Sequence, residues 1–255
     1  MLKTLGLTVA LFAGVQLASA PAQADELETL RETGTIRIAM SGAYPPFNFV
    51  NEQNQVVGFD PAVGTEIARR MGLEAEIVTT AWDGIIGGLL ANKFDAIVGS
   101  MTITAERDEV VDFVGPYYTD KRGIFTLEGS DVTSVSQLGD ATLGVTLGET
   151  HEQWARDEGY SINTYRGLPE LLLELQNGRV DAIIVDSIAA ILAAREIDLA
   201  ITPISDLETP SFGAGIAIRE GNPDLAAAMQ AALDEMMADG TYEAIALEWI
   251  GADIR

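Results

Sequence analysis

The stretch that decides the fold is Phe94–Phe113, which reads FDAIVGSMTITAERDEVVDF. It opens with a short apolar run, Asp95 to Val98, whose length suits a buried parallel strand better than a helix. After Gly99 the chain becomes polar, with three hydroxyl side chains and then a charged helix start that contains Arg107. A buried strand that ends in hydroxyls and leads to an arginine is typical of a ligand crevice at the carboxyl edge of an α/β sheet.

A second copy of this pattern lies farther along the chain. Leu89–Ser100, LLANKFDAIVGS, matches Glu174–Asp186, ELQNGRVDAIIVD. Each has an apolar helical tail, an Asn with a basic residue, and then a strand that contains Asp-Ala-Ile. The two copies align when Asp95 is placed opposite Asp181. A repeat on this scale predicts two similar α/β lobes.

The same alignment puts Ser100, at the end of the first strand, opposite Asp186, at the end of the second. If the two lobes face each other across a cleft, Arg107 and Asp186 supply one fixed positive group and one fixed negative group. A zwitterion needs that arrangement. In the competing interpretation the threonines cap a helix, and Arg107 is a solvated surface charge of little energetic consequence.

The first residues, MLKTLGLTVALFAGVQLASAPAQA, have the pattern of a secretory signal. Lys3 precedes an apolar core, and Ala22-Gln23-Ala24 forms a small-residue cleavage site. The apolar run is too short to span a bilayer comfortably. We therefore expect residues 1–24 to be a signal peptide, with no lipid anchor, since no Cys follows the cut.

The composition excludes several classes of function. The chain has 15 Lys and Arg against 39 Asp and Glu, a formal net charge of −24. Such a surface repels nucleic acid and anionic lipid, so neither is expected as a partner. With no Cys and with His151 as the single histidine, we expect no disulfide, no metal site and no catalytic triad. No catalytic residue and no cofactor are predicted.

Other strand-to-helix junctions hold residues suited to a ligand site. Tyr44 lies on a proline-containing loop after the predicted strand Thr35–Met40, and Trp82 follows another predicted strand. From periodicity alone Trp82 suits core packing as well as a ligand platform. Thr150 begins a helix in the second half, where a carboxylate would meet free backbone N–H groups. Asp60, directly before a proline, is predicted to be the N-cap of a helix.

These motifs resemble the polar amino-acid-binding family of bacterial extracytoplasmic solute receptors, which deliver amino acids, opines and related zwitterions to ABC importers. The resemblance covers essentially the whole mature chain, and it rests on GTIRIAMSGAYPPFNF, VVGFD, AWDGII, FDAIVGSMTITAERDEVVDF, PYY, GRVDAIIVD and DGTYEAIALEWIG. It implies the α/β, two-lobe periplasmic-binding-protein fold (type II), with two hinge crossings and a ligand cleft between closing lobes. Lobe 1 would comprise residues 25–117 and 211–255, and lobe 2 would be the inserted residues 118–210.

Carried over residue by residue, the resemblance implies a set of ligand-binding positions, namely Arg107, Asp186, Thr102, Thr150, Tyr44, Trp82, Gly99, Ser100, Ser41 and Glu149. Arg107 would clamp the α-carboxylate in two parallel hydrogen bonds, with Thr102 and the backbone at Thr150 completing the carboxylate shell. Asp186 and the Gly99 carbonyl would hold the α-ammonium.

The side-chain end of the ligand is less defined. Tyr44 and Trp82 would flank the ligand's side chain. Relatives that prefer cationic amino acids often have Asp where this chain has Ser41, and Glu149 or Asp83 could supply the missing charge. The resemblance implies a monomeric periplasmic receptor that passes its amino acid to an inner-membrane ABC permease. The identity of that amino acid stays open.

An enzyme on the same scaffold is the alternative. Certain periplasmic dehydratases that act on cyclohexadienyl acids share this architecture, and such an enzyme needs a general acid in the cleft. Glu149, Glu152 and His151 are the nearby candidates, and the sequence shows no pair that would orient one of them. We therefore expect a receptor and not an enzyme.

Overall fold

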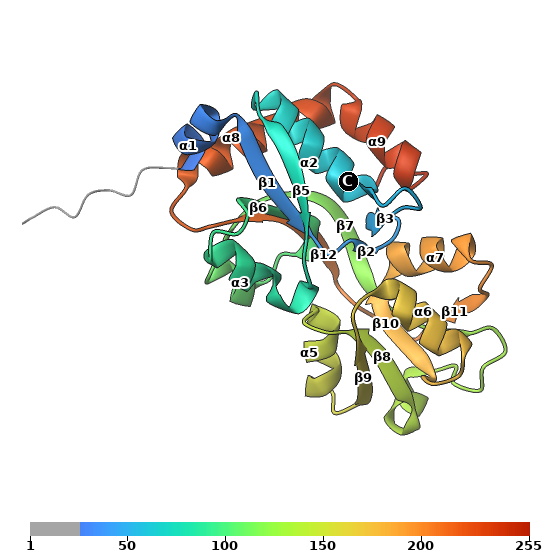
Figure 1. Cartoon of the computed structure of the whole chain (residues 1–255). Helices are drawn as coiled ribbons and strands as arrows, with labels where there is room; N and C mark the ends of the chain where they lie inside the picture. The colour runs from blue at the N-terminus through green and yellow to red at the C-terminus, as the bar shows by residue number, and fades with distance from the viewer. Residues whose placement is uncertain (1–25) are drawn as a thin grey trace, which may run out of the picture.

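A computed structural model of the chain describes residues 26–255, so the predicted signal peptide, 1–24, lies outside the described residues. Within them the chain forms two α/β lobes, drawn one above the other in Figure 1. Most helices and strands expected from the sequence lie within about two residues of the observed ones. The strands Ala96–Thr102 and Asp112–Leu127 are longer than expected, and the short strands Ala43–Tyr44, Asn48–Val50, Val56–Val57 and β11 (Ile201–Pro203) were not expected.

The upper lobe in Figure 1 is built on a sheet with the strand order β5-β1-β6-β12-β7. Its strands are β1 (Thr35–Met40), β5 (Glu74–Thr79), β6 (Ala96–Thr102), β7 (Asp112–Leu127) and β12 (Ser211–Ile218). A separate small sheet contains β2 (Ala43–Tyr44), β3 (Asn48–Val50) and β4 (Val56–Val57). The helices are α1 (Glu26–Thr33), α2 (Phe59–Arg70), α3 (Ile85–Leu90), α4 (Ala105–Asp108), α8 (Pro223–Ala238) and α9 (Thr241–Trp249), with a 3₁₀ turn at Trp82–Gly84.

The lower lobe continues the sheet in the order β7-β10-β8-β9, with β11 paired to the end of β7. Its strands are β8 (Thr142–Thr146), β9 (Ser161–Tyr165), β10 (Ala182–Asp186) and β11. Its helices are α5 (Thr150–Asp157), α6 (Leu168–Gln176) and α7 (Ser187–Glu196), with a 3₁₀ turn at Val135–Asp140. The strands β1, β5 and β6 are parallel in one lobe, and β8, β9 and β10 are parallel in the other.

The long strand β7 connects the two lobes. Its first part, Asp112–Lys121, pairs with β12, and its last residues pair with β10 and β11. The elements from β8 to β11 lie in sequence between β7 and β12. The chain therefore leaves the upper lobe along β7 and returns to it along β12.

The two aspartates that align in the sequence repeat have the same structural role. The backbone N–H of Asp95 donates to the carbonyl of Arg37, and its carboxylate accepts the Arg37 N–H at 2.8 Å. In the other lobe Asp181 makes the matching pair of bonds with Thr142, where the carboxylate accepts the N–H at 2.7 Å. Each aspartate ties the amino end of its strand to the neighbouring parallel strand.

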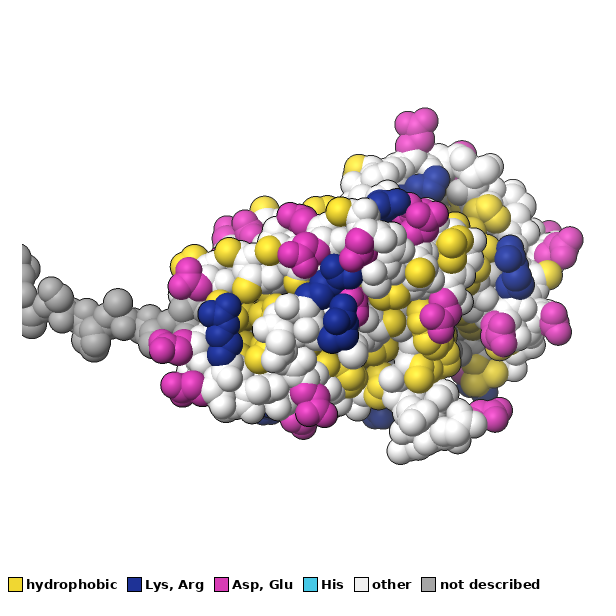
Figure 2. Space-filling view, turned by 90° about the horizontal axis from the view of Figure 1, so that it is seen from above, with side chains coloured by type: hydrophobic (Ala, Val, Ile, Leu, Met, Phe, Trp, Pro, Cys, Tyr) yellow, Lys and Arg dark blue, Asp and Glu magenta, His cyan; other side chains and the backbone are white. Residues whose placement is uncertain are grey.

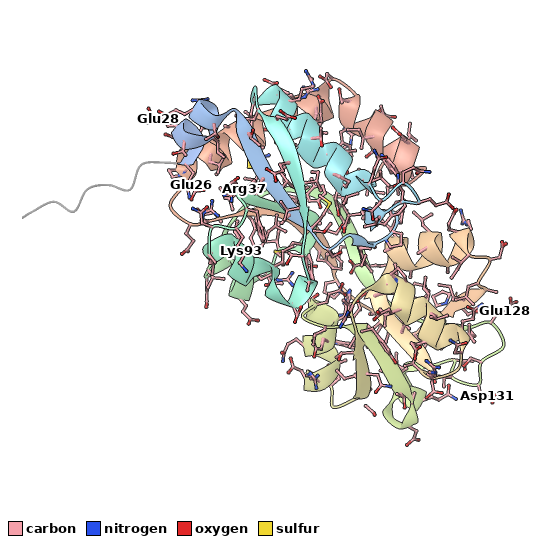
Figure 3. All side chains as sticks on the ribbon, in the orientation of Figure 1. Glu26, Glu28, Arg37, Lys93, Glu128 and Asp131 are labelled. Carbon is pink, nitrogen blue, oxygen red and sulfur yellow. The ribbon has the colours of Figure 1, made fainter. Side chains whose placement is uncertain are left out.

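Ion pairs gather at this amino edge of the upper sheet. Arg37 pairs with Asp95 at 2.7 Å, and Arg219 pairs with Glu26 at 2.5 Å. Figure 3 places Arg37 and Glu26 at the end of the upper lobe that lies away from the other lobe, with Glu128 at the opposite end of the molecule. The carboxyl edge of the sheet is left facing the second lobe.

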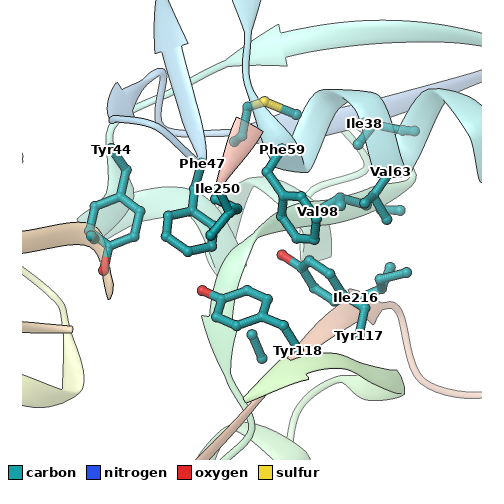
Figure 4. Close-up of a cluster of buried hydrophobic side chains, with 14 of the residues drawn as sticks. Ile38, Tyr44, Phe47, Phe59, Val63, Val98, Tyr117, Tyr118, Ile216 and Ile250 are labelled. Atoms are coloured by element: carbon teal, nitrogen blue, oxygen red, sulfur yellow. The ribbon is translucent and has the colours of Figure 1, made fainter. Parts of the chain in front are cut away.

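Aromatic packing fixes the loop that carries Tyr44. Phe47, Phe59 and Tyr118 are almost fully buried, and the rings of Phe47 and Tyr118 stack with centroids 4.9 Å apart. Tyr44 lies at one end of this group, 5.8 Å from Phe47 (Figure 4). Its ring therefore belongs to the core, and its hydroxyl extends beyond it.

Acidic side chains are scattered over the face shown in Figure 2 and form no single patch there. Lys and Arg side chains are fewer, as the composition requires. In the part of the chain that the structure describes, no helix is both long enough and apolar enough to cross a membrane.

Candidate ligand-binding site

A cavity lies between the lobes at the carboxyl ends of the parallel strands. Its wall includes residues at or shortly after the ends of all six parallel strands, which are β1, β5 and β6 in the upper lobe and β8, β9 and β10 in the lower one. The empty space within it, including open solvent at its mouth, is about 430 Å³. The ten positions expected from the sequence all line it, namely Ser41, Tyr44, Trp82, Gly99, Ser100, Thr102, Arg107, Glu149, Thr150 and Asp186.

Arg107 supplies the positive side of the cavity. The side chain of Thr104 caps α4 and accepts the Arg107 N–H at 3.2 Å, which fixes the start of this short helix. Guanidinium Nη1 donates to the Thr102 carbonyl at 2.9 Å, and the group lies 5.8 Å from the centre of the Trp82 ring. Among residues 26–255 no carboxylate forms an ion pair with it, and burial lowers the pKa of Arg107. An anion in the cavity would offset that cost.

Asp186 supplies the negative side. It ends β10 and is 5% exposed. Its Oδ2 accepts the Tyr44 hydroxyl at 2.5 Å, and its Oδ1 lies 2.6 Å from His151 Nε2. The Tyr44 bond runs from the upper lobe to the lower one. A carboxylate offers about four acceptor positions, so Asp186 can still accept hydrogen bonds from an ammonium group.

His151 has its tautomer fixed by its neighbours. Arg122 Nε donates to His151 Nδ1 at 3.1 Å, and the Arg122 guanidinium stacks on Trp154 at 4.6 Å. Because a guanidinium can only donate, Nδ1 is the acceptor, and the ring proton sits on Nε2, where it is donated to Asp186. The sequence showed no pair that would orient His151, and the structure shows one. The bond from His151 Nε2 orients the Asp186 carboxylate in the cavity wall.

A buried aspartate supports the upper wall of the cavity. Asp60 is 0% exposed and accepts from Asn48 Nδ2 at 2.6 Å, Ser100 Oγ at 2.9 Å and the Tyr117 hydroxyl at 2.7 Å. Ser41 Oγ in turn donates to Asn48 Oδ1 at 2.9 Å. The hydroxyl protons of Ser41 and Ser100 are thus used inside the protein. Toward a ligand both offer only acceptor lone pairs, which suits an ammonium group.

The expectation that Asp60 caps a helix is wrong. Helix α2 has Gly58 as its N-cap, with no side-chain cap, and Asp60 lies inside its first turn. A Cβ on Gly58 would lie 2.4 Å from the carbonyl oxygen of Phe47. The close contact between Gly58 and the loop at Phe47 places the N-cap two residues before Asp60. The Asp60 carboxylate therefore turns inward to the cavity wall.

Residues 36–252 match the bacterial extracellular solute-binding proteins, family 3. The chain belongs to this family. The predicted family and the predicted two-lobe α/β fold are thereby confirmed.

Three comparisons with known proteins illustrate the likeness. The L-cystine-binding protein TcyJ of Escherichia coli strain K12 is 34% identical over 256 residues, which cover 97% of this chain and 94% of the relative. The ABC transporter arginine-binding protein 1 of the same strain is 29% identical over 219 residues, covering 84% of this chain and 90% of the relative. The crystal structure of the ancestral amino acid-binding protein AncCDT-1, a precursor of cyclohexadienyl dehydratase, has a TM-score of 0.81 and 32% identity, covering 88% of this chain and 99% of that one.

The cavity is also lined by residues that were not predicted as ligand-binding positions, namely Ala43, Thr146, His151, Arg166 and Gly167. Arg166 directly follows β9, as Trp82 comes shortly after β5, and that position at a strand end was the available signal. His151 adjoins the predicted Thr150 at the start of α5. Asp83 does not line the cavity, whereas Glu149 does. Among the described residues no group of His, Asp and Glu is arranged to hold a metal ion.

Three carboxyls at or near the cavity have raised pKa values. Burial raises the pKa of Asp60 to about 6, although three donors oppose the rise. Burial raises the pKa of Glu149 to about 7. Burial, together with the charge of Asp186, raises the pKa of Asp120 on β7 to about 7. Each of the three groups therefore holds its proton to higher pH than an ordinary carboxyl.

The unligated protein should become more stable as the pH falls from about 8 to about 5.5. A carboxyl whose pKa is higher in the folded state binds more protons when folded, so the free energy of unfolding falls as the pH rises through that interval. The interval runs from 3.8 to about 7 for Asp120 and from 4.5 to about 7 for Glu149. We expect Tm to be about 5 °C or more higher at the lower pH, measured by calorimetry.

The double variant Asp120→Asn, Glu149→Gln is the control for this prediction. It removes both titrating groups, so the slope of Tm against pH should become shallower between about pH 6 and 8. The same slope in the variant and in the unaltered protein would contradict the assignment.

Proposed function

We propose that this family 3 protein is a periplasmic receptor that captures a polar or cationic amino acid, or a derivative such as an opine, between its two lobes. It then delivers the ligand to the permease of an ABC transporter. One observation carries the proposal: Arg107, half-buried and without a carboxylate partner among the described residues, shares a cavity with the buried Asp186. A free α-amino acid matches both charges at once.

The proposed pose follows the chemistry of the wall. The α-carboxylate is held by Arg107, with Thr102 beside it and the first turn of α5 at Thr150. The α-ammonium is held by Asp186 and the Gly99 carbonyl. Both poles are bound in a site that the lobes exclude from water, where charge-assisted hydrogen bonds are stronger than at an exposed surface.

The acceptor-only hydroxyls of Ser41 and Ser100 add to the ammonium side of this pose. Tyr44 and Trp82 flank the ligand's side chain. Glu149 is the carboxyl in the cavity wall best placed to contact a polar or cationic side chain.

The ligand class is supported by the names of the relatives. TcyJ is named for L-cystine and the second relative for arginine. AncCDT-1 is named as an amino acid-binding protein. We propose a polar amino acid of this range for the present chain, and a receptor rather than an enzyme.

The proposed mechanism needs lobes that separate and close. We propose that lobe 1 comprises residues 25–117 and 211–255 and that lobe 2 comprises residues 118–210, in a monomer secreted through residues 1–24. The continuous strand β7 and the return along β12 support hinges at these crossings. Ligand contacts from both lobes would then stabilise the closed state.

A thermal-shift screen tests the proposal. The probes are L-cystine, L-arginine, L-lysine, L-histidine, L-glutamine and octopine, with prephenate and arogenate added as substrates of the rival enzyme. A ligand at about 100 times its Kd stabilises a protein by about 2.7 kcal/mol, which corresponds to a rise in Tm of about 5–10 °C. At least one amino compound should give this shift and be recovered unchanged. No shift with any of them, or turnover of prephenate or arogenate, would contradict the receptor.

Close contact between the lobes gives a second test. Gly167, the N-cap of α6, has extended backbone angles of φ 178 and ψ 177, which alanine can adopt. A Cβ there would lie 2.6 Å from the Ala43 carbonyl oxygen of the other lobe. Gly167→Ala should therefore hinder closure and weaken ligand binding about 10-fold, since overpacking costs about 1–3 kcal/mol.

The measurement for Gly167→Ala is isothermal calorimetry with the amino acid found in the screen. The matched control is Gly139→Ala, where a Cβ would meet nothing within 4 Å. The control should bind like the unaltered protein. Equal affinities of the two variants would show that this contact does not limit closure.

A further inference from the structure

A groove continues outward from one side of the ligand cavity. It shares Ser41, Ala43, Trp82 and Arg166 with the cavity and runs on past Thr80 and Asp83. The upper lobe supplies one bank, and Arg166 with Leu147 supplies the other. Because the cavity and the groove share four lining residues, the two adjoin, and a ligand that extends past these residues would reach both.

Arg166 is held at the point where the cavity and the groove meet. Its backbone N–H donates to Glu170 Oε2 at 3.0 Å. The next residue, Gly167, lies against Ala43 of the opposite lobe. The Arg166 side chain is exposed, and it has no hydrogen bond or ion pair with any other described side chain. In a chain of net charge −24, this guanidinium is a local positive charge left available to a ligand.

Asp83 supplies the opposite charge along the same groove. It is exposed and forms no ion pair within residues 26–255. Arg166 comes just after β9 and Asp83 shortly after β5, which are the outer strands of the two parallel sets. The groove thus has a cation from one lobe and an anion from the other. Arg107 and Asp186 give the cavity the same pair of charges with the lobes exchanged.

We propose that the groove is a second subsite, which binds the distal α-amino acid group of a two-headed ligand. The distal carboxylate binds Arg166, and the distal ammonium binds Asp83. This inference rests on the proposed function, because the first amino acid group occupies the cavity between Arg107 and Asp186. The ligand class is the bis-α-amino acids, such as L-cystine or meso-2,6-diaminopimelate.

Within the polar and cationic amino acids of the proposed function, Arg166 favours a ligand whose side chain has a second carboxylate. A ligand held by its α-groups in the cavity directs its side chain toward the mouth. There a guanidinium or ammonium meets the like charge of Arg166, and a carboxylate meets an opposite one. Like-charge contact is an established route to specificity. Arg166 therefore selects for a second carboxylate as well as binding it.

Calorimetric titration with matched probes tests the subsite. S-(Methylthio)-L-cysteine retains the disulfide of L-cystine and lacks the second amino acid group. Meso-2,6-diaminopimelate has two such groups and no sulfur. L-Arginine has one such group and a cationic side chain. The proteins are the unaltered chain, Arg166→Ala, Arg166→Lys and the control Arg195→Ala, an exposed arginine in the last turn of α7.

The unaltered protein should bind a two-headed probe about 10-fold or more tightly than S-(methylthio)-L-cysteine, in line with one charge-assisted contact. Arg166→Ala should bring that ratio close to 1 by weakening the two-headed probe more than the one-headed probe. It should also leave L-arginine binding unchanged or tighter. Arg166→Lys should give an intermediate ratio, and Arg195→Ala should behave like the unaltered protein.

Three results would overturn the subsite. One is an unaltered protein that does not distinguish two-headed from one-headed probes. Another is an Arg166→Ala variant that keeps the full ratio. The third is a variant that weakens every probe equally, which would make Arg166 a structural residue. If no probe binds the unaltered protein, the proposed function fails and this inference fails with it. Binding of one-headed probes without discrimination overturns the subsite alone.

Discussion

Replacing Arg107 with alanine should weaken binding of the amino acid ligand by about 30-fold to several thousand-fold, or about 2–5 kcal/mol. The half-buried guanidinium donates one hydrogen bond to the Thr102 carbonyl and has no carboxylate partner among the described residues. The ligand's carboxylate would supply that partner. Without Arg107 the ligand's carboxylate lies in a closed cavity without a counter-charge. The loss of binding free energy is therefore larger than for a similar change at a solvent-exposed site.

The Tm of the unligated Arg107→Ala protein distinguishes a binding defect from a folding defect. Burial lowers the pKa of Arg107, so the unpaired cation does not stabilise the empty protein. The Tm of Arg107→Ala should accordingly stay the same or rise, while its affinity falls. Arg107→Lys keeps the charge but cannot make two parallel hydrogen bonds, and an intermediate affinity is expected.

Calorimetry with the ligand found in the screen measures these affinities. The matched control is Arg179→Ala, which removes an exposed arginine paired with Glu174 at 2.6 Å on the surface. This control should bind normally. If Arg107→Ala bound as tightly as the control, Arg107 would have no role in the site.

Replacing Asp60 with alanine should lower the free energy of unfolding by about 2–5 kcal/mol. Three buried donors, from Asn48, Ser100 and Tyr117, would lose their acceptor, at about 1–3 kcal/mol each. Removing the carboxylate also removes the free-energy cost of burying its charge, but this gain in stability is smaller than the loss from the three donors. Burial raises the pKa of Asp60 from 3.8 to about 6, and a shift of that size corresponds to about 3 kcal/mol of cost when the group is ionised.

Denaturant titration at neutral pH measures this loss, which corresponds to a fall in Tm of about 5–15 °C. Asp60→Asn should lose less, because the amide keeps one acceptor oxygen. The control is Asp131→Ala, an exposed aspartate at the far end of the other lobe (Figure 3). A loss in Asp60→Ala no greater than in this control would contradict the network.

The variant also tests the link between core and site. Asp60 holds Ser100 directly and Ser41 through Asn48, and both serines line the cavity. Folded Asp60→Ala protein should therefore bind its ligand more weakly than the unaltered protein. Unchanged affinity would show that the backbone alone places Ser41 and Ser100.

The sequence by itself determined the lobe plan and the location of the cavity. Short apolar runs mark buried parallel strands, and a ligand crevice in such a sheet opens at their carboxyl ends. Residues such as Ser100, Thr102 and Asp186, which end strands or lie near their ends, could therefore be named before any contact was known, whereas Ser41 and Glu149 were named from the resemblance to the family. The repeat around Asp95 and Asp181 added that there are two such edges, because the second half of the chain copies the first.

Tertiary structure alone decided how these residues are paired. The bonds of Asp186 to Tyr44 and His151 join positions 142 and 35 residues apart in the chain. Asp60 has the local pattern of a helix cap, yet it faces the buried donors behind the cavity. Arg166 has the local pattern of an ordinary surface arginine, and the packing of α6 against β2 places it at the cavity. Local sequence carries backbone periodicity, whereas the partner of a buried polar group is set by packing between distant segments, which leaves no local pattern to read.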